Sequence, residues 1–180
     1  MSLLIRPTDT DESVRPGERP KPYALRVARE KARAADASGP SGLLPVLAAD
    51  TTVALGEWIP GKPGTPERAV ETLLRLSGRT HQVHTAVVVR LGERELSRVV
   101  TTSVRFRRLS DADIQAYVES GEPLDRAGGY AIQGGGGALV DRVVGSYTGV
   151  VGLPLAEALS LLAAIGTGLA HQIDGSTPRS

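Results

Sequence analysis

The stretch Thr80-His81-Gln82-Val83-His84-Thr85-Ala86-Val87-Val88-Val89-Arg90-Leu91 decides the fold of this chain. It alternates along its length and is rich in β-branched residues, which is typical of a β-strand. Gly92-Glu93 comes next and predicts a tight turn, and Glu95 to Phe106 predicts an antiparallel partner strand. The sequence therefore predicts one long β-hairpin.

Helical patterns lie on both sides of this hairpin along the chain. Tyr23 to Ala37 places apolar residues on one face of a helix. A second helix starts at Thr65-Pro66-Glu67, where Thr65 is a suitable N-cap, and ends before Gly78. Two more helices are predicted from Ser110 through Ser120 and from Leu153-Pro154 through Ala164. With a further strand at 138–144, the chain is predicted to be α/β, with a mixed twisted sheet flanked by helices.

An acidic residue follows a short apolar run near the middle of the chain. The run Leu43 to Ala48 reads as a buried strand, so Asp50 is expected where that strand stops. Thr51 to Leu55 either continues the strand or returns as a second one. Ligands of open α/β sheets bind at the carboxyl ends of strands, and Lys62 follows on the next loop. The two residues could hold a metal and a phosphate together, or they could be a turn aspartate and a solvated lysine.

The bulk composition is that of an ordinary globular chain. The 180 residues carry a net charge of +1, which gives no field favouring nucleic acid or an anionic membrane. No stretch is long and apolar enough to span a membrane. Cysteine is absent, which excludes disulfides and thiol chemistry and fits a cytoplasmic protein. Residues 1–165 are expected to form one domain and 166–180 a flexible polar tail.

Four other places carry residues with chemical potential. Glu12, in an acidic run, is either solvated or a ligand for a hard divalent cation. Lys31 is a surface charge unless its helix faces Asp50. Gly134 to Gly137 has the composition of a phosphate-binding turn, with a flexible turn as the alternative, and the Gln133 amide could pair with a nucleobase edge. His81 and His84 are three apart on a strand and should face opposite sides, which disfavours a shared metal site.

Several short stretches, taken together and in order, resemble the Maf family of septum-formation-like nucleotide pyrophosphatases. They are Asp9-Thr10-Asp11-Glu12, Ala28-Arg29-Glu30-Lys31-Ala32, Ala49-Asp50-Thr51, Gly61-Lys62-Pro63, Leu76-Ser77-Gly78-Arg79-Thr80-His81, Gly121-Glu122-Pro123-Leu124-Asp125, Ala131-Ile132-Gln133-Gly134, and Gly145-Ser146-Tyr147 with Val150-Val151-Gly152-Leu153-Pro154.

The resemblance implies a two-lobed α/β fold with a central cleft, like that of the inosine triphosphatases. It implies hydrolysis of a nucleoside triphosphate to the monophosphate and pyrophosphate with Mg²⁺ or Mn²⁺, and a possible homodimer. The segments at Ala49-Asp50-Thr51 and Gly145-Ser146-Tyr147 resemble the branch that acts on dTTP and UTP; 7-methyl-GTP is the alternative substrate.

Carried over by position, the resemblance assigns roles to individual residues. Asp50 would be the proton acceptor, and Lys31 and Lys62 would bind phosphates. Glu12 would hold the metal together with Asp50. The substrate-binding residues would be Thr51, Gln133 and Arg79, the first two setting base selectivity.

The beginning of the chain departs from the family pattern. The family starts with a strand, a Ser-x-Ser-Pro-Arg-Arg phosphate-binding loop and a helix, and none of these has a counterpart here. The first strand and helix are therefore expected to be missing from the fold. A rival expectation follows: a catalytically weakened or inactive protein that binds nucleotides in a regulatory role.

Overall fold

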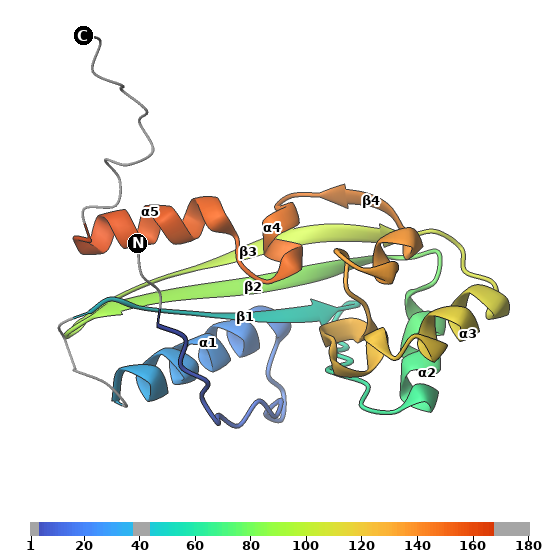
Figure 1. Ribbon diagram of the computed structural model, residues 1–180, viewed down its shortest axis with the longest axis horizontal. Coiled ribbons are helices and arrows are strands. Elements are labelled where there is room, and N and C mark those ends of the chain that lie inside the picture. Colours follow the sequence, from blue (N-terminus) through green and yellow to red (C-terminus); the bar gives the residue numbers. More distant parts are fainter. Residues whose placement is uncertain (1–3, 38–43, 168–180) are drawn as a thin grey trace, which may run out of the picture.

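The predicted hairpin is the backbone of a four-stranded antiparallel sheet. The computed structural model describes residues 4–37 and 44–167. The strands are β1 (Val46–Ala54), β2 (Thr80–Leu91), β3 (Arg94–Phe106) and β4 (Val140–Val144), and they lie in the order β1-β2-β3-β4 (Figure 1). β2 and β3 pair along their whole length, from Thr80 opposite Arg105 to Leu91 opposite Arg94. The prediction of a sheet flanked by helices is confirmed.

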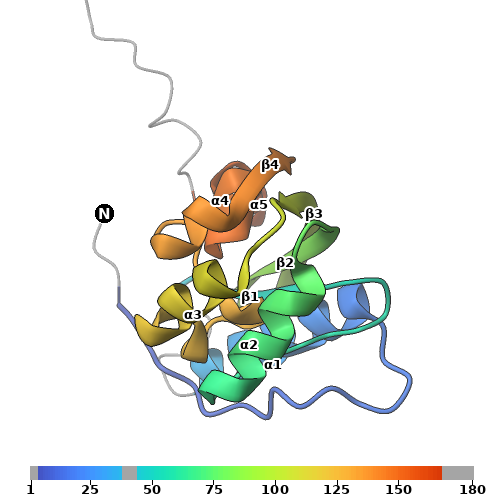
Figure 2. The same cartoon turned by 90° about the vertical axis from the view of Figure 1, so that its right-hand side faces the viewer.

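Helices cover both faces of this sheet. They are α1 (Pro20–Ala37), α2 (Pro66–Leu76), α3 (Asp111–Glu119), α4 (Tyr147–Val151) and α5 (Leu155–Ile165). Figure 1 shows α1 on one face and α4 and α5 on the other, while α2 and α3 stand at one end of the sheet, an arrangement also seen end-on in Figure 2. No helix in the described part of the chain is both long enough and apolar enough to cross a membrane.

Two predicted helix starts are confirmed at atomic detail. The Thr65 hydroxyl accepts a hydrogen bond from the Arg68 N–H, and Pro66 opens α2. Ser110 and Asp113 form a reciprocal capping box at the start of α3. These local signals fix where both helices begin.

The glycine-rich stretch after α3 forms three short 3-10 turns. They are η1 (Glu122–Asp125), η2 (Ala127–Gly129) and η3 (Gly135–Leu139).

The buried apolar residues fall into two clusters, one in each lobe. The larger packs α2, α3 and the 3-10 turns against one half of the hairpin, around Leu73, Val83 and Phe106. The smaller packs α1 against the other half, around Ala28 and Val88. β2 contributes to both clusters, through Val83 in the larger and Ala86 and Val88 in the smaller, so the hairpin connects the two lobes.

Asp50 does not lie where the sequence predicted. β1 continues through Thr51 and Thr52 to Ala54, so Asp50 sits in mid-strand opposite Ala86. β-Branched residues sustain the strand past the carboxylate. The strand-end argument also fails because all strand pairs in the described residues are antiparallel. What exposes this region is that β1 is an edge strand of the described sheet.

Some predictions fall on residues outside the described part of the chain. They are Leu43 at the start of the apolar run and residues 168–180 of the expected tail.

Candidate active site

A cleft follows the free edge of β1. It consists of two adjoining cavities of about 580 Å³ and about 200 Å³. Six residues line both cavities, which joins them into one space: Glu12, Asp50, Thr51, Val53, Lys62 and Ala127. The larger volume is within the usual range for sites that bind small molecules.

Lys31 ties the two predicted metal-binding carboxylates together. Its Nζ lies 2.6 Å from Glu12 Oε1 and 2.8 Å from Asp50 Oδ1. Lys31 reaches Asp50 because α1 packs on the face of β1 to which Asp50 points. Glu12 is held by its own main chain, since its carbonyl accepts a 2.7 Å hydrogen bond from the Tyr23 hydroxyl. The structure thus brings together three residues that are far apart in the sequence.

The two oxygens of Asp50 have different surroundings. Oδ1 accepts the hydrogen bond from Lys31, whereas Oδ2 has only a long contact of 3.4 Å with the Thr52 hydroxyl. Asp50 is only 9% exposed. Burial raises the pKa of its carboxyl above the ordinary value, although Lys31 acts in the opposite direction. Asp50 is therefore a stronger base than a solvated aspartate and keeps one oxygen available.

Lys31 remains a cation in this setting. Burial lowers the pKa of its ammonium group, but hydrogen bonds to Asp50 and Glu12 outweigh burial, and the pKa is raised overall. The ammonium group next to Asp50 offsets the free-energy cost of burying that carboxylate. It also leaves a cation facing the cleft.

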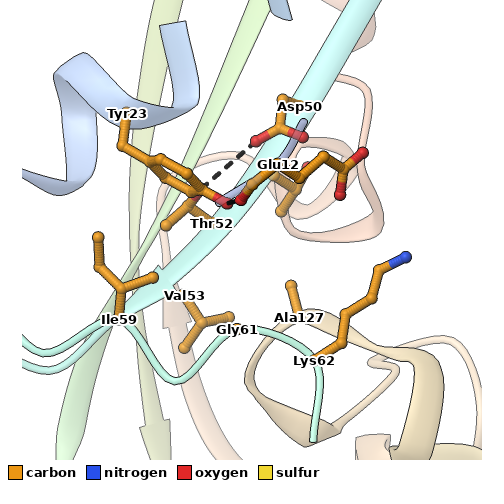
Figure 3. A pocket seen from close by; sticks show the side chains of 10 residues that line it. Glu12, Tyr23, Asp50, Thr52, Val53, Ile59, Gly61, Lys62 and Ala127 are labelled. Carbon is orange, nitrogen blue, oxygen red and sulfur yellow. Dashed lines mark hydrogen bonds between the residues drawn. The ribbon is translucent and has the colours of Figure 1, made fainter. Parts of the chain in front are cut away.

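Lys62 reaches the cleft from a loop on the opposite side. Figure 3 shows Asp50 and Glu12 on one wall of the smaller cavity and Gly61 and Lys62 on the loop across from them. The loop is anchored on both sides of Lys62, because the Gly61 carbonyl accepts from Gly128 N–H at 2.8 Å and Gly64 N–H donates to the Leu124 carbonyl at 2.9 Å. The side chain itself is half exposed and pairs only with the exposed Asp125, at 3.1 Å. Such a pair contributes little and exchanges readily for another anion.

The larger cavity is also lined by the two residues assigned to base selectivity, Thr51 and Gln133. Thr51 points to the face opposite Asp50, where its hydroxyl lies 3.0 Å from that of Thr85. Gln133 is exposed on the wall formed by Ala131 to Gly134, and Gly152 closes the space near Thr51. The larger cavity thus combines the cations Lys31 and Lys62 with the uncharged polar side chains of Thr51 and Gln133.

The glycine-rich turn is occupied by a carboxylate of the protein itself. Glu122 accepts hydrogen bonds from Gly135 N–H at 3.0 Å and from Gly136 N–H at 3.1 Å. A Cβ on Gly134 would lie 2.1 Å from Glu122 Oε2, so a side chain there would force the carboxylate to move. The turn is therefore ordered, and the two amides that could cradle a phosphate already hold an anion. Its likeness in composition to a phosphate-binding turn was misleading.

Arg79 is not brought to the cleft. It lies in the exposed turn between α2 and β2, beyond the residues that line either cavity. Backbone hydrogen bonds from Gly78 N–H to the Arg107 carbonyl and from Phe106 N–H to the Arg79 carbonyl hold this turn at the end of the sheet. The prediction that Arg79 binds substrate therefore has no support in this geometry.

The two histidines have separate partners, as the strand spacing predicted. His81 Nε2 lies 2.9 Å from the Tyr130 hydroxyl, and His84 Nδ1 lies 3.0 Å from the Thr101 hydroxyl. No three His, Cys, Asp or Glu residues in the described ranges form a metal cluster. Glu12 and Asp50 are nevertheless a suitable pair for Mg²⁺ or Mn²⁺, because Mg²⁺ is commonly held by one or two carboxylates together with substrate phosphates.

Comparison with known proteins now decides the family. Residues 1–165 match the profile of the family described as Maf-like protein. The chain belongs to the Maf family. Three Maf relatives, each named dTTP/UTP pyrophosphatase, are similar over nearly all of the chain. The protein of Anaeromyxobacter dehalogenans strain 2CP-1 is 56% identical over 171 residues, which is 92% of this chain and 84% of the relative.

The two other relatives agree with the first. The protein of Cereibacter sphaeroides is 53% identical over 165 residues, covering 92% of this chain and 84% of the relative. That of Myxococcus xanthus strain DK1622 is 50% identical over 164 residues, covering 91% and 82%. The family predicted from the short stretches is therefore confirmed, and the Maf fold accounts for the two lobes and the cleft between them.

Three residues at this Maf cleft were missed as site residues. Tyr23 had been read only as part of a helix face, and its hydroxyl holds Glu12 in place. Arg126 lines the larger cavity, and no carboxylate within ion-pair distance of it is found among the described residues. Glu122 holds the glycine-rich turn. The one signal for Glu122 was its position in a stretch matching the family, and for Arg126 there was only its place directly after that stretch.

Proposed function

We propose that this chain hydrolyses dTTP and UTP to the monophosphate and pyrophosphate. One observation carries the proposal: a single cavity is lined by Lys31, Asp50, Thr51, Lys62 and Gln133, five of the residues to which the family resemblance gives roles. The named relatives support the same reaction and the same pair of substrates. They favour dTTP and UTP over 7-methyl-GTP.

In this proposal Asp50 accepts the proton of the attacking water. Its Oδ2 is the atom with room for that water, since Oδ1 is engaged by Lys31. The raised pKa of Asp50 brings its basicity closer to neutral pH, which favours general-base catalysis. Lys31 fixes the carboxylate in position and contributes positive charge near the α-phosphate.

Lys62 binds the outer phosphates. Its exposed pair with Asp125 is weak, so a triphosphate can take the place of that carboxylate. The two backbone hydrogen bonds hold the main chain of its loop beside the cleft. A positive charge placed there stabilises the negative charge that develops on the phosphates in the transition state.

Glu12 and Asp50 are the residues that would hold the divalent cation, Mg²⁺ or Mn²⁺; because Lys31 engages Oδ1, the remaining oxygen of Asp50 serves either as the proton acceptor or as a ligand of the cation. When bound, that cation would neutralise charge on the triphosphate and polarise the phosphoryl oxygens. Two other residues of the cavity then orient the base: the Gln133 amide offers one donor and one acceptor, which match the O4 and N3–H edge of uracil or thymine. Thr51 limits the space beside it.

The direct test is pyrophosphate release from dTTP and UTP by the purified chain with Mg²⁺ or Mn²⁺, beside nucleotide binding measured by calorimetry. We expect release that needs the divalent cation and is faster for dTTP and UTP than for 7-methyl-GTP. Binding without release would instead support a nucleotide-binding regulatory protein. Absence of both binding and release would overturn the proposal.

A further inference from the structure

The segment that carries Gln133 is held by a short network of hydrogen bonds. The Tyr117 hydroxyl donates to Glu122 Oε1 at 2.6 Å and accepts from Ala131 N–H at 3.1 Å. Glu122 in turn accepts from Gly135 N–H and Gly136 N–H. The segment is thus fixed two residues before Gln133, at Ala131, and two and three residues after it, at Gly135 and Gly136.

Between these two anchors the chain makes a tight turn. Gly134 N–H donates to the Ala131 carbonyl at 3.1 Å, so Gln133 is the third residue of a closed turn. The Glu122 carboxylate lies beside this turn, in the space that a Cβ on Gly134 would enter. The side chain of Gln133, by contrast, makes no hydrogen bond to another described residue and lies exposed on the cavity wall.

Glu122 is well suited to act as a rigid anchor. Its carboxylate accepts three hydrogen bonds, and hydrogen bonds to an ionised acceptor are the stronger kind. Burial raises the pKa of Glu122, but the hydrogen bonds from Tyr117 and the two glycines outweigh burial and lower it overall. Glu122 also lines the same cavity as Gln133, so a change in its position is transmitted to the wall directly.

We propose that Glu122, together with Tyr117, is a positioning residue that sets the base selectivity of this site by fixing where Gln133 presents its amide. The proposal rests on the proposed function, because it needs a pyrimidine base at Gln133. It assigns Glu122 no contact with the substrate. We expect a displaced Gln133 amide to change the selectivity between uracil and cytosine most. The base-pairing edges of these two bases differ only in which positions donate and which accept hydrogen bonds.

The test uses Glu122→Gln, Gln133→Ala and the double variant, with Glu71→Gln as the matched control on the exposed face of α2. The glutamine at 122 keeps the shape of the side chain but has one acceptor oxygen in place of two, so at least one of the three hydrogen bonds is lost. The measured quantity is the ratio of kcat/KM for UTP to that for CTP. Tyr117→Phe, which frees Ala131 N–H, is the second route to the same effect.

We expect Glu122→Gln and Tyr117→Phe each to lower the UTP-to-CTP ratio by about tenfold, mostly through KM for UTP, as the loss of one good hydrogen bond would. In the Gln133→Ala background Glu122→Gln should produce no further change in this ratio. Amide hydrogen exchange of residues 131–136 should be faster in Glu122→Gln and unchanged in the Glu71→Gln control.

Other outcomes separate this proposal from the proposed function. An unchanged ratio, or equal effects of Glu122→Gln with and without Gln133, would overturn the positioning role while leaving hydrolysis of dTTP and UTP intact. If the wild-type chain binds UTP without releasing pyrophosphate, the proposed function fails, and the same cycle is then measured on binding of UTP and CTP by calorimetry. A wild-type chain that binds neither nucleotide overturns both.

Discussion

Asp50 and Thr51 are neighbours in β1, yet their side chains point to opposite faces of the sheet. Asp50 contacts Lys31 on the face covered by α1, and Thr51 contacts Thr85 on the face covered by α4. Both still line one cavity, because β1 is an edge strand of the described sheet and the cleft wraps around that edge. The proposed proton acceptor and the proposed base-selecting residue are therefore consecutive residues of one edge strand, with their side chains on opposite faces of the sheet.

Asp50→Asn should lower the rate of pyrophosphate release by 10²-fold or more, because the amide cannot accept the proton. Lys62→Ala should have an effect on the order of 10²-fold through the loss of a fixed charge. Steady-state kinetics with dTTP measures both. Circular dichroism should show an intact fold, and Lys21→Ala, an exposed lysine of α1, provides the control for Lys62. Turnover at the wild-type rate in either site variant would remove that residue from the site.

The pH dependence of kcat/KM should report the two charges around Asp50. The Lys31 ammonium lowers the pKa of Asp50 and the Glu12 carboxylate raises it. Lys31→Met should therefore move the acid limb of the profile to higher pH, and Glu12→Gln should move it to lower pH, whatever each does to the maximum rate. Shifts of the same sign in both variants would mean that the limb belongs to another group.

Gly128→Ala should destabilise the fold by roughly 2–5 kcal/mol, from left-handed backbone strain and overpacking together. Gly128 has φ of 71°, and a Cβ there would lie 2.6 Å from the buried Val53 side chain. Gly56→Ala is the matched control: φ is 63°, but nothing lies within 4 Å of its Cβ, so only the strain of about 1–2 kcal/mol applies. Urea unfolding measures the difference, and equal losses would show that Val53 adapts.

His81 should make the fold sensitive to mild acid. Burial lowers the pKa of this imidazole from the ordinary 6.5 to about 4. Between these values the unfolded chain binds a proton that the folded chain does not, so stability falls as pH drops from 6.5 to 4 and His81 causes no further loss below that. The total is on the order of 3 kcal/mol. His81→Leu should flatten this part of the stability curve in urea unfolding at a series of pH values; an unchanged slope would contradict the assignment.

Local signals in the sequence predicted most of the secondary structure. The caps at Thr65 and Ser110 and the alternation after Thr80 act within a few residues, so they can be read without knowing the fold. The helix α4 was not predicted, because it is only five residues long and contains a glycine. Ser146 caps it, but no helical repeat of apolar residues follows that would mark this serine as a helix start.

The site was predictable only through family resemblance. From residue types and spacing alone, Asp50, Lys31 and Glu12 could equally be turn or surface residues. No local sequence signal shows that α1 packs on the face of the sheet to which Asp50 points. Arg79 was also assigned only by position in the family pattern, and its turn lies at the end of the sheet, outside the residues that line the two cavities. The role of Glu122 could not be predicted from local sequence. Its partners Gly135 and Gly136 are 13 and 14 residues further along the chain, and only the fold brings them together.

The carboxylate in the glycine-rich turn also limits where the cleft can bind phosphate. With those amides taken by Glu122, the described residues leave the positive charges of Lys31, Lys62 and Arg126 as the places along the cleft where phosphate groups are attracted. In the proposed function, the phosphates of a bound nucleotide therefore lie at these cations and not in the glycine-rich turn, and added pyrophosphate should compete with the substrate for the same cations.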